Sequence, residues 1–315
     1  MAIDSTIPLQ RSGVRFRSLR GTYLREWFVR VLLGGCSALS VLTTLAIISV
    51  LFFEAYQFFA APEVTFTGFI TGTEWNPLMG SEKTFGVWAL VSGTLIVSLI
   101  AMLFALPLGL ITAIYLSEYA HPKVRAVLKP ALEVLAGIPS VVYGFFALTV
   151  ITPFLKIFSE GFSTYNATSA GLAVGILCIP IVSSLVEDAL RAVPRSLRDG
   201  AYGLGATRFE VSIRVVVPAA LSGIISAFLL AISRAVGETM IVALAAGSRP
   251  HLTLDPRQDT QTMTGWMVQM ALGDVSSFDL AYLSMYAVAA LLFVITMLLT
   301  VSGNIVRSRF REVYQ

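Results

Sequence analysis

Six long apolar stretches constrain the fold of this chain more than any other feature of its sequence. A helix needs about 20 apolar residues to cross the hydrocarbon core of a bilayer, and helices satisfy their own backbone hydrogen bonds there. Hydrophobic residues make up 56% of the chain and charged residues 13%, which excludes an ordinary soluble domain. We therefore predict an all-α polytopic membrane protein. Its six predicted transmembrane helices cover residues 28–53, 85–116, 131–155, 170–186, 215–246 and 280–306.

The basic residues predict which ends of these helices face the cytoplasm. Of the 22 Lys and Arg residues, 17 lie in the N-terminal segment, the second and fourth connections, and the C-terminal tail. Cytoplasmic loops carry an excess of such residues. Both termini and residues 191–214 are therefore predicted to be cytoplasmic. The net charge of +3 reflects this asymmetry, so the expected surroundings are membrane lipid and not nucleic acid.

The same pattern divides the chain into parts with different expected environments. Within the core, residues 247–279 are predicted to form a second external segment, because proline, glycine and acidic residues interrupt the apolar pattern there. The external segment near the N-terminus is expected to pack as a small plug or lid over the core. The predicted parts are a cytoplasmic basic arm (1–27), the first transmembrane helix (28–53), an external segment (54–84), a core of five transmembrane helices (85–306) and a cytoplasmic tail (307–315).

The polar loop at residues 191–214 is predicted to form two short helices joined by a sharp turn. Pro194 suits the start of the first helix, where its missing N–H has no consequence. Gly203 and Gly205 permit a sharp break, and Thr207 with Glu210 has the form of a capping box that starts the second helix. We expect this unit to present Ala201, Tyr202, Leu204 and Phe209 at its surface.

Two charged residues interrupt the fifth apolar stretch. As one helix its 32 residues would be about 48 Å long, so a break is expected near Pro218 and Gly223. Glu238 follows Arg234 by one helical turn, which predicts that both lie on one face. Each charge costs at least about 2.5 kcal/mol at the centre of a membrane helix. The pair is therefore predicted to line a pathway for an oxyanion, which a guanidinium group matches. The alternative is an ion pair that only fixes helix packing.

Two further features of the apolar stretches have structural interpretations. Pro139, together with Gly137, is expected to kink the third transmembrane helix. Glu187 and Asp188 lie within helical reach of Arg191, which predicts a solvated surface pair.

The sequence also limits the chemistry that the chain can carry. Cys36 and Cys178 both lie inside apolar stretches and do not predict a disulfide. His121 and His251 are predicted on opposite sides of the membrane, which excludes a histidine metal site. None of the lysines follows a glycine, so the chain has no phosphate-binding loop of the ATPase kind. We therefore expect no cofactor in this chain, and any ATP must be hydrolysed by a partner.

The loop at 191–214 resembles the EAA loop of ABC importer permeases. Asp199 stands for the Glu of that motif, Gly200 for its first Ala, and Ala201 and Gly205 match it; Val215, Val217 and Pro218 close the pattern. The resemblance implies a MetI-like permease bundle and a loop that docks onto a separate ATPase subunit. The residues expected to make or shape that contact are Asp199, Gly200, Ala201, Tyr202, Gly205, Thr207 and Pro218.

Two further motifs resemble the phosphate-specific (Pst) permeases, and within them the C-type more than the A-type subunit. These motifs are residues 133–144 and 234–240. The resemblance implies import of inorganic phosphate across a bacterial inner membrane, with Arg234 and Glu238 on the substrate pathway. It also implies three partners: a homologous A-type permease, an ATPase dimer and an external phosphate-binding protein. The alternatives are an importer of another oxyanion (molybdate, sulfate or phosphonate), a passive anion channel or an intramembrane enzyme, although neither of the last two needs an ATPase dock.

Overall fold

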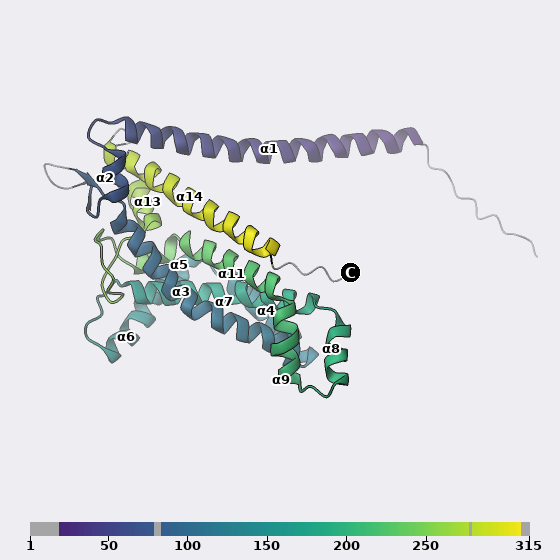
Figure 1. The fold of residues 1–315 in the computed structure, drawn as a ribbon. Coiled ribbons are helices and arrows are strands. Elements are labelled where there is room, and N and C mark those ends of the chain that lie inside the picture. The colour runs from purple at the N-terminus through teal and green to yellow at the C-terminus, as the bar shows by residue number, and fades with distance from the viewer. Residues whose placement is uncertain (1–18, 79–82, 277–278, 310–315) are drawn as a thin grey trace, which may run out of the picture. The chain divides into compact units, whose positions relative to one another are not determined.

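The computed structural model describes residues 19–78, 83–276 and 279–309, and helices dominate these residues (Figure 1). The chain consists of two units, Met1–Val50 and Leu51–Gln315. The first unit contributes the N-terminal part of helix α1 (Leu19–Ala60), whose apolar side chains cover all sides of the helix. A helix of this kind suits a lipid environment. It ends at Ala60, beyond the predicted boundary at residue 53.

Two tightly packed helices form the centre of the second unit. Helices α3 (Trp88–Ile114) and α7 (Ala167–Ala192) pack along their lengths. A Cβ atom at Gly109 would lie 2.6 Å from Val182 Cγ1, and one at Gly171 would lie 2.7 Å from Ile100 Cβ. Only glycine permits such close approach, as is typical of helix pairs in membranes. Helices α11 (Leu221–Val236) and α14 (Leu280–Arg309) complete this packing.

The third predicted helix is broken where the sequence indicated a kink. Helix α4 (Pro122–Ala136) ends beside Gly137, and Pro139 precedes helix α5 (Ser140–Phe146). The π-helical turn η2 (Ala147–Ile151) and helix α6 (Thr152–Phe158) continue α5. The apolar span is therefore Ser140–Phe158, and the predicted start at residue 131 is wrong. The reason is that Gly137 and Pro139 separate α4 completely from the span.

The fifth predicted helix is also divided. Helix α9 (Arg208–Val211), the π-helical turn η3 (Ser212–Val216) and helix α10 (Val217–Ala219) precede a 71° bend before α11. The bend lies at Ala220, between the two predicted breakers. The short helix α12 (Met240–Ala245) follows α11. Counted with this bent pair as one span, the described residues contain six candidate membrane spans, which confirms the predicted fold class.

Segments predicted to be external pack together at one end of the second unit (Figure 1). They include helix α2 (Phe66–Thr71), the antiparallel strands β1 (Trp75–Asn76) and β2 (Thr84–Phe85), and helix α13 (Met263–Leu272). The rings of Trp75 and Trp266 lie 5.4 Å apart, edge to face. Lys83 Nζ donates to Asp279 Oδ1 at 2.9 Å, which ties the hairpin to the start of α14. Helix α2 and the two strands thus pack with α13 in one hydrophobic cluster, and α13 is a helix that the sequence did not predict.

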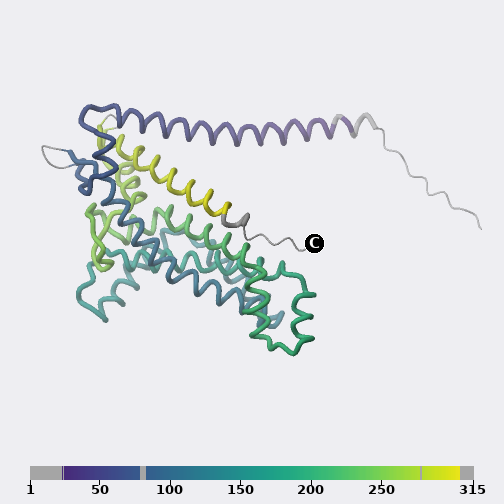
Figure 2. Tube along the Cα trace, viewed as in Figure 1, coloured from purple at the N-terminus to yellow at the C-terminus, as the bar shows by residue number. Residues whose placement is uncertain are grey.

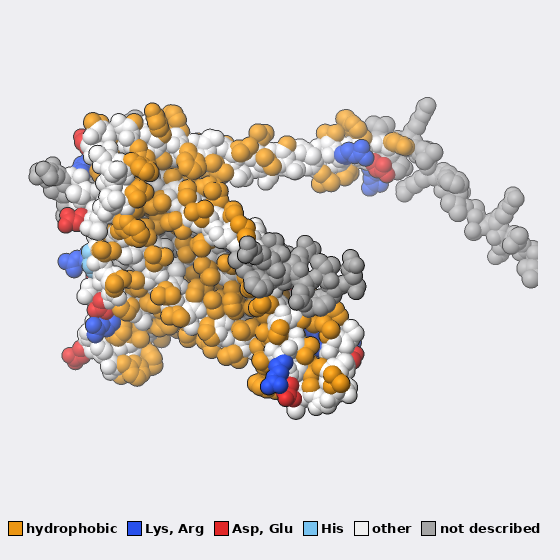
Figure 3. Space-filling view, in the orientation of Figure 1, with side chains coloured by type: hydrophobic (Ala, Val, Ile, Leu, Met, Phe, Trp, Pro, Cys, Tyr) orange, Lys and Arg blue, Asp and Glu red, His pale blue; other side chains and the backbone are white. Residues whose placement is uncertain are grey.

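The polar and apolar side chains of the second unit are segregated on the face seen in Figure 3. Hydrophobic side chains cover the middle of this face, and charged side chains gather at its two ends. Helices α8 (Arg195–Gly203) and α9 turn back at the end far from α2 and α13 (Figures 1 and 2). An apolar band between two polar ends is the arrangement expected of a membrane-spanning bundle.

Candidate functional site

The loop at residues 191–214, named here the coupling loop, adopts the predicted helix–turn–helix conformation. Helix α8 follows Pro194 and ends at Gly203. Gly205 has a φ of 84°, a left-handed conformation that favours glycine. Thr207 then begins α9 with a complete capping box: its N–H donates to Glu210 Oε2 at 2.9 Å, and the Glu210 N–H donates to Thr207 Oγ1 at 3.3 Å. The turn is therefore fixed by local backbone chemistry.

The tip of the coupling loop exposes large apolar side chains. Leu204 is 91% exposed, Phe209 is 65% exposed and Tyr202 is 42% exposed. Ala201 differs from the expectation, because it is half-buried against the core of the second unit and not presented at the surface. Three large apolar side chains are thus exposed on an otherwise polar loop. The remaining predicted contact residues, Asp199, Gly200, Gly205, Thr207 and Pro218, are exposed.

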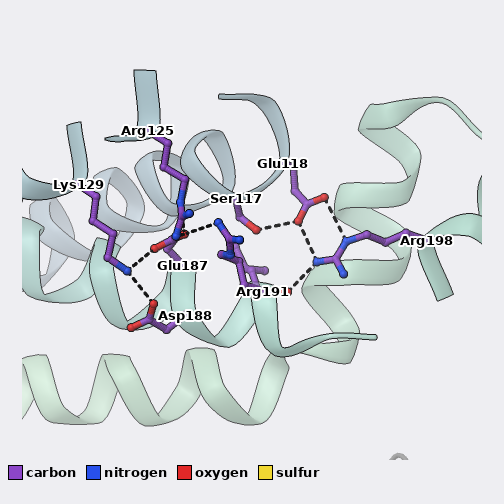
Figure 4. Close-up of polar contacts among 9 residues, drawn as sticks. Ser117, Glu118, Arg125, Lys129, Glu187, Asp188, Arg191 and Arg198 are labelled. Carbon is purple, nitrogen blue, oxygen red and sulfur yellow. Dashed lines mark hydrogen bonds and ion pairs between the residues drawn. The ribbon is translucent and has the colours of Figure 1, made fainter. Parts of the chain in front are cut away.

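One arginine ties α8 to the ends of two membrane helices (Figure 4). Arg198 Nη2 donates to Glu118 Oε1 at 3.1 Å, and Glu118 lies on the π-helical turn η1 (Tyr115–Tyr119) that continues α3. The same guanidinium donates to the carbonyl oxygens of Leu190 at 2.8 Å and Val193 at 2.6 Å, at the end of α7. The Arg198 side chain is 15% exposed and that of Glu118 is 7% exposed. Arg198 therefore joins α8 directly to the ends of α3 and α7.

Glu187 is the centre of a second charge cluster, and the prediction of a solvated surface pair is wrong for it (Figure 4). Its side chain is fully buried and lies 2.6 Å from Arg125 Nη2, 2.7 Å from Lys129 Nζ and 3.6 Å from Arg191 Nη1. The physical reason is that α4 packs against α7 and brings two distant cations over the carboxylate. Asp188 does stay at the surface, 61% exposed, where it binds Lys129 at 2.8 Å. Hydrogen bonds to Asp188 and Glu187 raise the pKa of Lys129 above its usual range.

The expected side-by-side arrangement of Arg234 and Glu238 on one helix is also wrong. Helix α11 ends at Val236, Gly237 caps it, and Glu238 lies in the non-helical link before α12. The four-residue spacing therefore places the two side chains on no common helical face. Among the described residues they form no ion pair with each other.

The two charges differ in their surroundings. Glu238 is 8% exposed, and its carboxylate accepts a hydrogen bond from the Ile241 N–H at 3.5 Å. Its backbone carbonyl accepts one from Thr264 Oγ1 at 2.7 Å, which joins the link to α13. Arg234 is exposed in the single chain. An exposed guanidinium on a membrane helix is stable only where it meets water, an anion or another subunit.

A cavity of about 940 Å³ opens at the C-terminal end of α12, the end away from Glu238. Its walls come from the strand β1 region, α5, η2, α12, the segment between α12 and α13, and α13 itself. Trp75 and Trp266 supply aromatic walls. The cavity contains hydrogen-bond donors and acceptors of the kind that bind a small polar solute. The elements that form its walls lie at the end of the bundle opposite the coupling loop (Figure 1). The polar side chains in its lining are those of Asn76, Tyr165, Ser248, Arg249, Asp259, Gln261 and Gln269.

Comparison with known proteins assigns the class. A family described as "Binding-protein-dependent transport system inner membrane component" matches residues 105–312. The chain therefore belongs to this family of multi-pass membrane permease subunits. Among solved structures, a bacterial ABC transporter that imports the acidic polysaccharide alginate superposes with a TM-score of 0.65, at 14% identity, over 94% of this chain and all of that one. The MetNI methionine ABC transporter superposes with a TM-score of 0.53, at 18% identity, over 72% of this chain and 95% of that one.

Relatives of similar sequence narrow the class further. The probable ABC transporter permease YqgH of Bacillus subtilis is 31% identical over 84% of this chain and 82% of its own length. The phosphate transport system permease PstC of Mesorhizobium japonicum is 35% identical over 73% of this chain and 75% of its own length. A phosphate transport system permease PstA 1 of Mycobacterium tuberculosis is 38% identical, over 54% of each chain. The predicted resemblance to phosphate permeases, the C-type above all, is confirmed.

Proposed function

We propose that this chain is a permease subunit of an ATP-driven importer of inorganic phosphate. The identity to PstC permeases over about three quarters of both chains is the observation that carries the proposal. The exposed Leu204 and Phe209 of the coupling loop give it a mechanical basis, because a transport subunit without an ATPase of its own needs a docking surface. The loop lies in the cytoplasm, where it contacts an ATPase dimer that hydrolyses ATP, and this chain itself needs no cofactor.

In this proposal the remaining partners complete the pathway. A homologous A-type permease covers the exposed Arg234 and encloses a route between the two chains. An external phosphate-binding protein delivers its ligand to the end of the bundle that carries the large cavity. Arg234 offers two parallel donors to phosphate oxygens, while the buried Glu238 sets the position of the link between α11 and α12. ATP-driven closure of the ATPases then moves α8, and with it the ends of α3 and α7.

Purification of the chain with its co-expressed partner subunits, followed by reconstitution in proteoliposomes, tests the proposal. We expect ATP-dependent uptake of radiolabelled phosphate that requires the external binding protein. Uptake of molybdate, sulfate and phosphonate, measured under the same conditions, tests the second candidate, which is import of another oxyanion. If one of these is taken up faster than phosphate, the substrate assignment is wrong; uptake without ATP would indicate the passive channel.

The role of Arg234 is tested by Arg234→Gln, which keeps the side chain polar but removes its charge. We expect loss of phosphate uptake with the subunits still assembled, because the anion loses its charged partner inside the membrane. Lys156→Gln is the matched control, since it removes a basic charge from an exposed side chain on α6, outside both the coupling loop and the large cavity. Native uptake by an assembled Arg234→Gln complex would show that this arginine is only architectural.

A further inference from the structure

A small cavity lies where helix α8 meets the ends of the membrane helices. Its volume is about 400 Å³, and its walls come from η1, the start of α4, the end of α7 and the start of α8. Four arginine side chains line it, one from α4, one from α7 and two from α8: Arg125, Arg191, Arg195 and Arg198. Three of these, Arg125, Arg191 and Arg198, are labelled in Figure 4 together with Glu118. The cavity is separate from both the large cavity and the exposed tip of the coupling loop.

The accessible charge in this cavity is positive. Glu187 is fully buried and shares its single negative charge among Arg125, Lys129 and Arg191. Arg191 is the farthest of the three, at 3.6 Å, and its side chain is 45% exposed. The Glu187 carboxylate thus does not line the cavity, whereas the guanidinium groups of Arg125 and Arg191 do.

The other charged side chains of the cavity, Glu118 and Arg195, also leave an excess of positive charge. Glu118, the acid in the cavity wall, is 7% exposed and is bound to Arg198 and Ser117. Arg195 is exposed and has no ion-pair partner in the part of the chain that the structure describes. Planar guanidinium groups bind phosphate oxygens in pairs, with better geometry than an ammonium group. The cavity is therefore suited to an anion with several oxygens.

Helix α4 places this cavity beside the membrane surface. The helix has no buried side chain and exposes Val124, Val127 and Leu128 together with basic residues on the same short segment. An amphipathic basic helix of this kind lies in the interface between lipid headgroups and water. Basic pockets beside such segments bind anionic headgroups.

We propose that the four-arginine cavity is a binding site for a phosphate-bearing anion, either a lipid headgroup or free phosphate. The occupant bridges Arg195 of α8, Arg191 of α7 and Arg125 of α4, and so fastens the coupling loop to the membrane helices. The proposal rests on the proposed function only in placing this cavity on the cytoplasmic side. The site is distinct from Arg234 and from the large cavity, because neither Arg234 nor any residue of that cavity lines it.

The test measures binding to the purified complex and not transport. Complexes in nanodiscs of phosphatidylcholine with a minority of phosphatidylglycerol are compared by native mass spectrometry, and complexes in neutral detergent are titrated with inorganic phosphate. We expect Arg195→Gln to weaken retention of the anion about fivefold, the value for one basic residue near an anionic surface. Arg214→Gln removes the same charge outside the cavity and is expected to change nothing.

The outcomes separate the two sources and the competing explanations. Selective retention of phosphatidylglycerol identifies a headgroup site, and a phosphate isotherm that weakens in Arg195→Gln identifies free phosphate. Phosphate bound on the transport pathway is unaffected by Arg195→Gln, so the difference reports this cavity alone. Equal losses in both variants would reduce the effect to general surface charge and overturn the proposal. If the permease subunits alone bind no anion, and the cavity is protected only when the ATPase is present, the cavity is a contact surface for the ATPase. That outcome would also overturn the proposal. Binding that persists without phosphate import would refute the transport assignment but keep this site.

Discussion

Replacement of Glu187 by glutamine is the sharpest test of how α4 is held against α7. The change keeps the volume of the side chain but removes the negative charge that three cations share. Loss of one partner from a fully buried ion pair costs about 3–5 kcal/mol. The cations here are 24–45% exposed, so water stabilises them in part, and Lys129 keeps its bond to Asp188. We therefore expect a loss of about 2 kcal/mol in the free energy of unfolding.

Thermal unfolding in detergent, followed by tryptophan fluorescence, measures this loss. A change of about 2 kcal/mol corresponds to a fall in Tm of about 3 °C for a chain of this size. Asp188→Asn is the matched control, because Asp188 is adjacent but 61% exposed, and surface pairs contribute at most about 1 kcal/mol. If Glu187→Gln and Asp188→Asn lower the Tm equally and by less than about 2 °C, Glu187 is a solvated surface residue and the argument from burial is refuted.

Three further predictions concern the coupling loop, the external plug and the orientation. Gly205→Val forces a β-branched residue into a left-handed conformation and should uncouple ATP hydrolysis from transport. Gly203→Ala is the control, because a Cβ atom there meets open space. Normal coupling in Gly205→Val would show that the turn has no role in coupling. The hydrogen bond from Lys83 lowers the pKa of Asp279 below its usual value of 3.8. The salt bridge therefore stabilises the fold above that pH, and this stabilisation is lost as the pH falls through the pKa of the folded state. The Tm difference between wild type and Asp279→Asn should shrink in acid, and a constant difference would contradict this. Cysteine placed at Thr73, which is exposed, should react with an impermeant reagent outside intact cells and cysteine at Ser196 should not; the reverse would invert the orientation.

Local chemistry was sufficient to predict much of this protein from its sequence. The membrane spans follow from apolarity over about 20 residues, a property that needs no knowledge of neighbouring helices. The breaks at Pro139 and near Pro218 follow from a missing N–H and a fixed φ. The coupling loop is equally local, because the positive φ of Gly205 and the capping box at Thr207 involve residues only a few positions apart.

The tertiary structure decided which charges are buried and which are paired. Nothing in the sequence near Glu187 indicates that Arg125 and Lys129 cover it, since they lie about sixty residues away on a helix that packs back over α7. Arg234 and Glu238 have helical spacing, but Gly237 ends the helix between them. Trp75 and Trp266 likewise meet only because the hairpin and α13 share one end of the bundle. Burial and pairing depend on the sum of contacts between distant segments, whereas spans, breaks and caps depend on the backbone of a few adjacent residues.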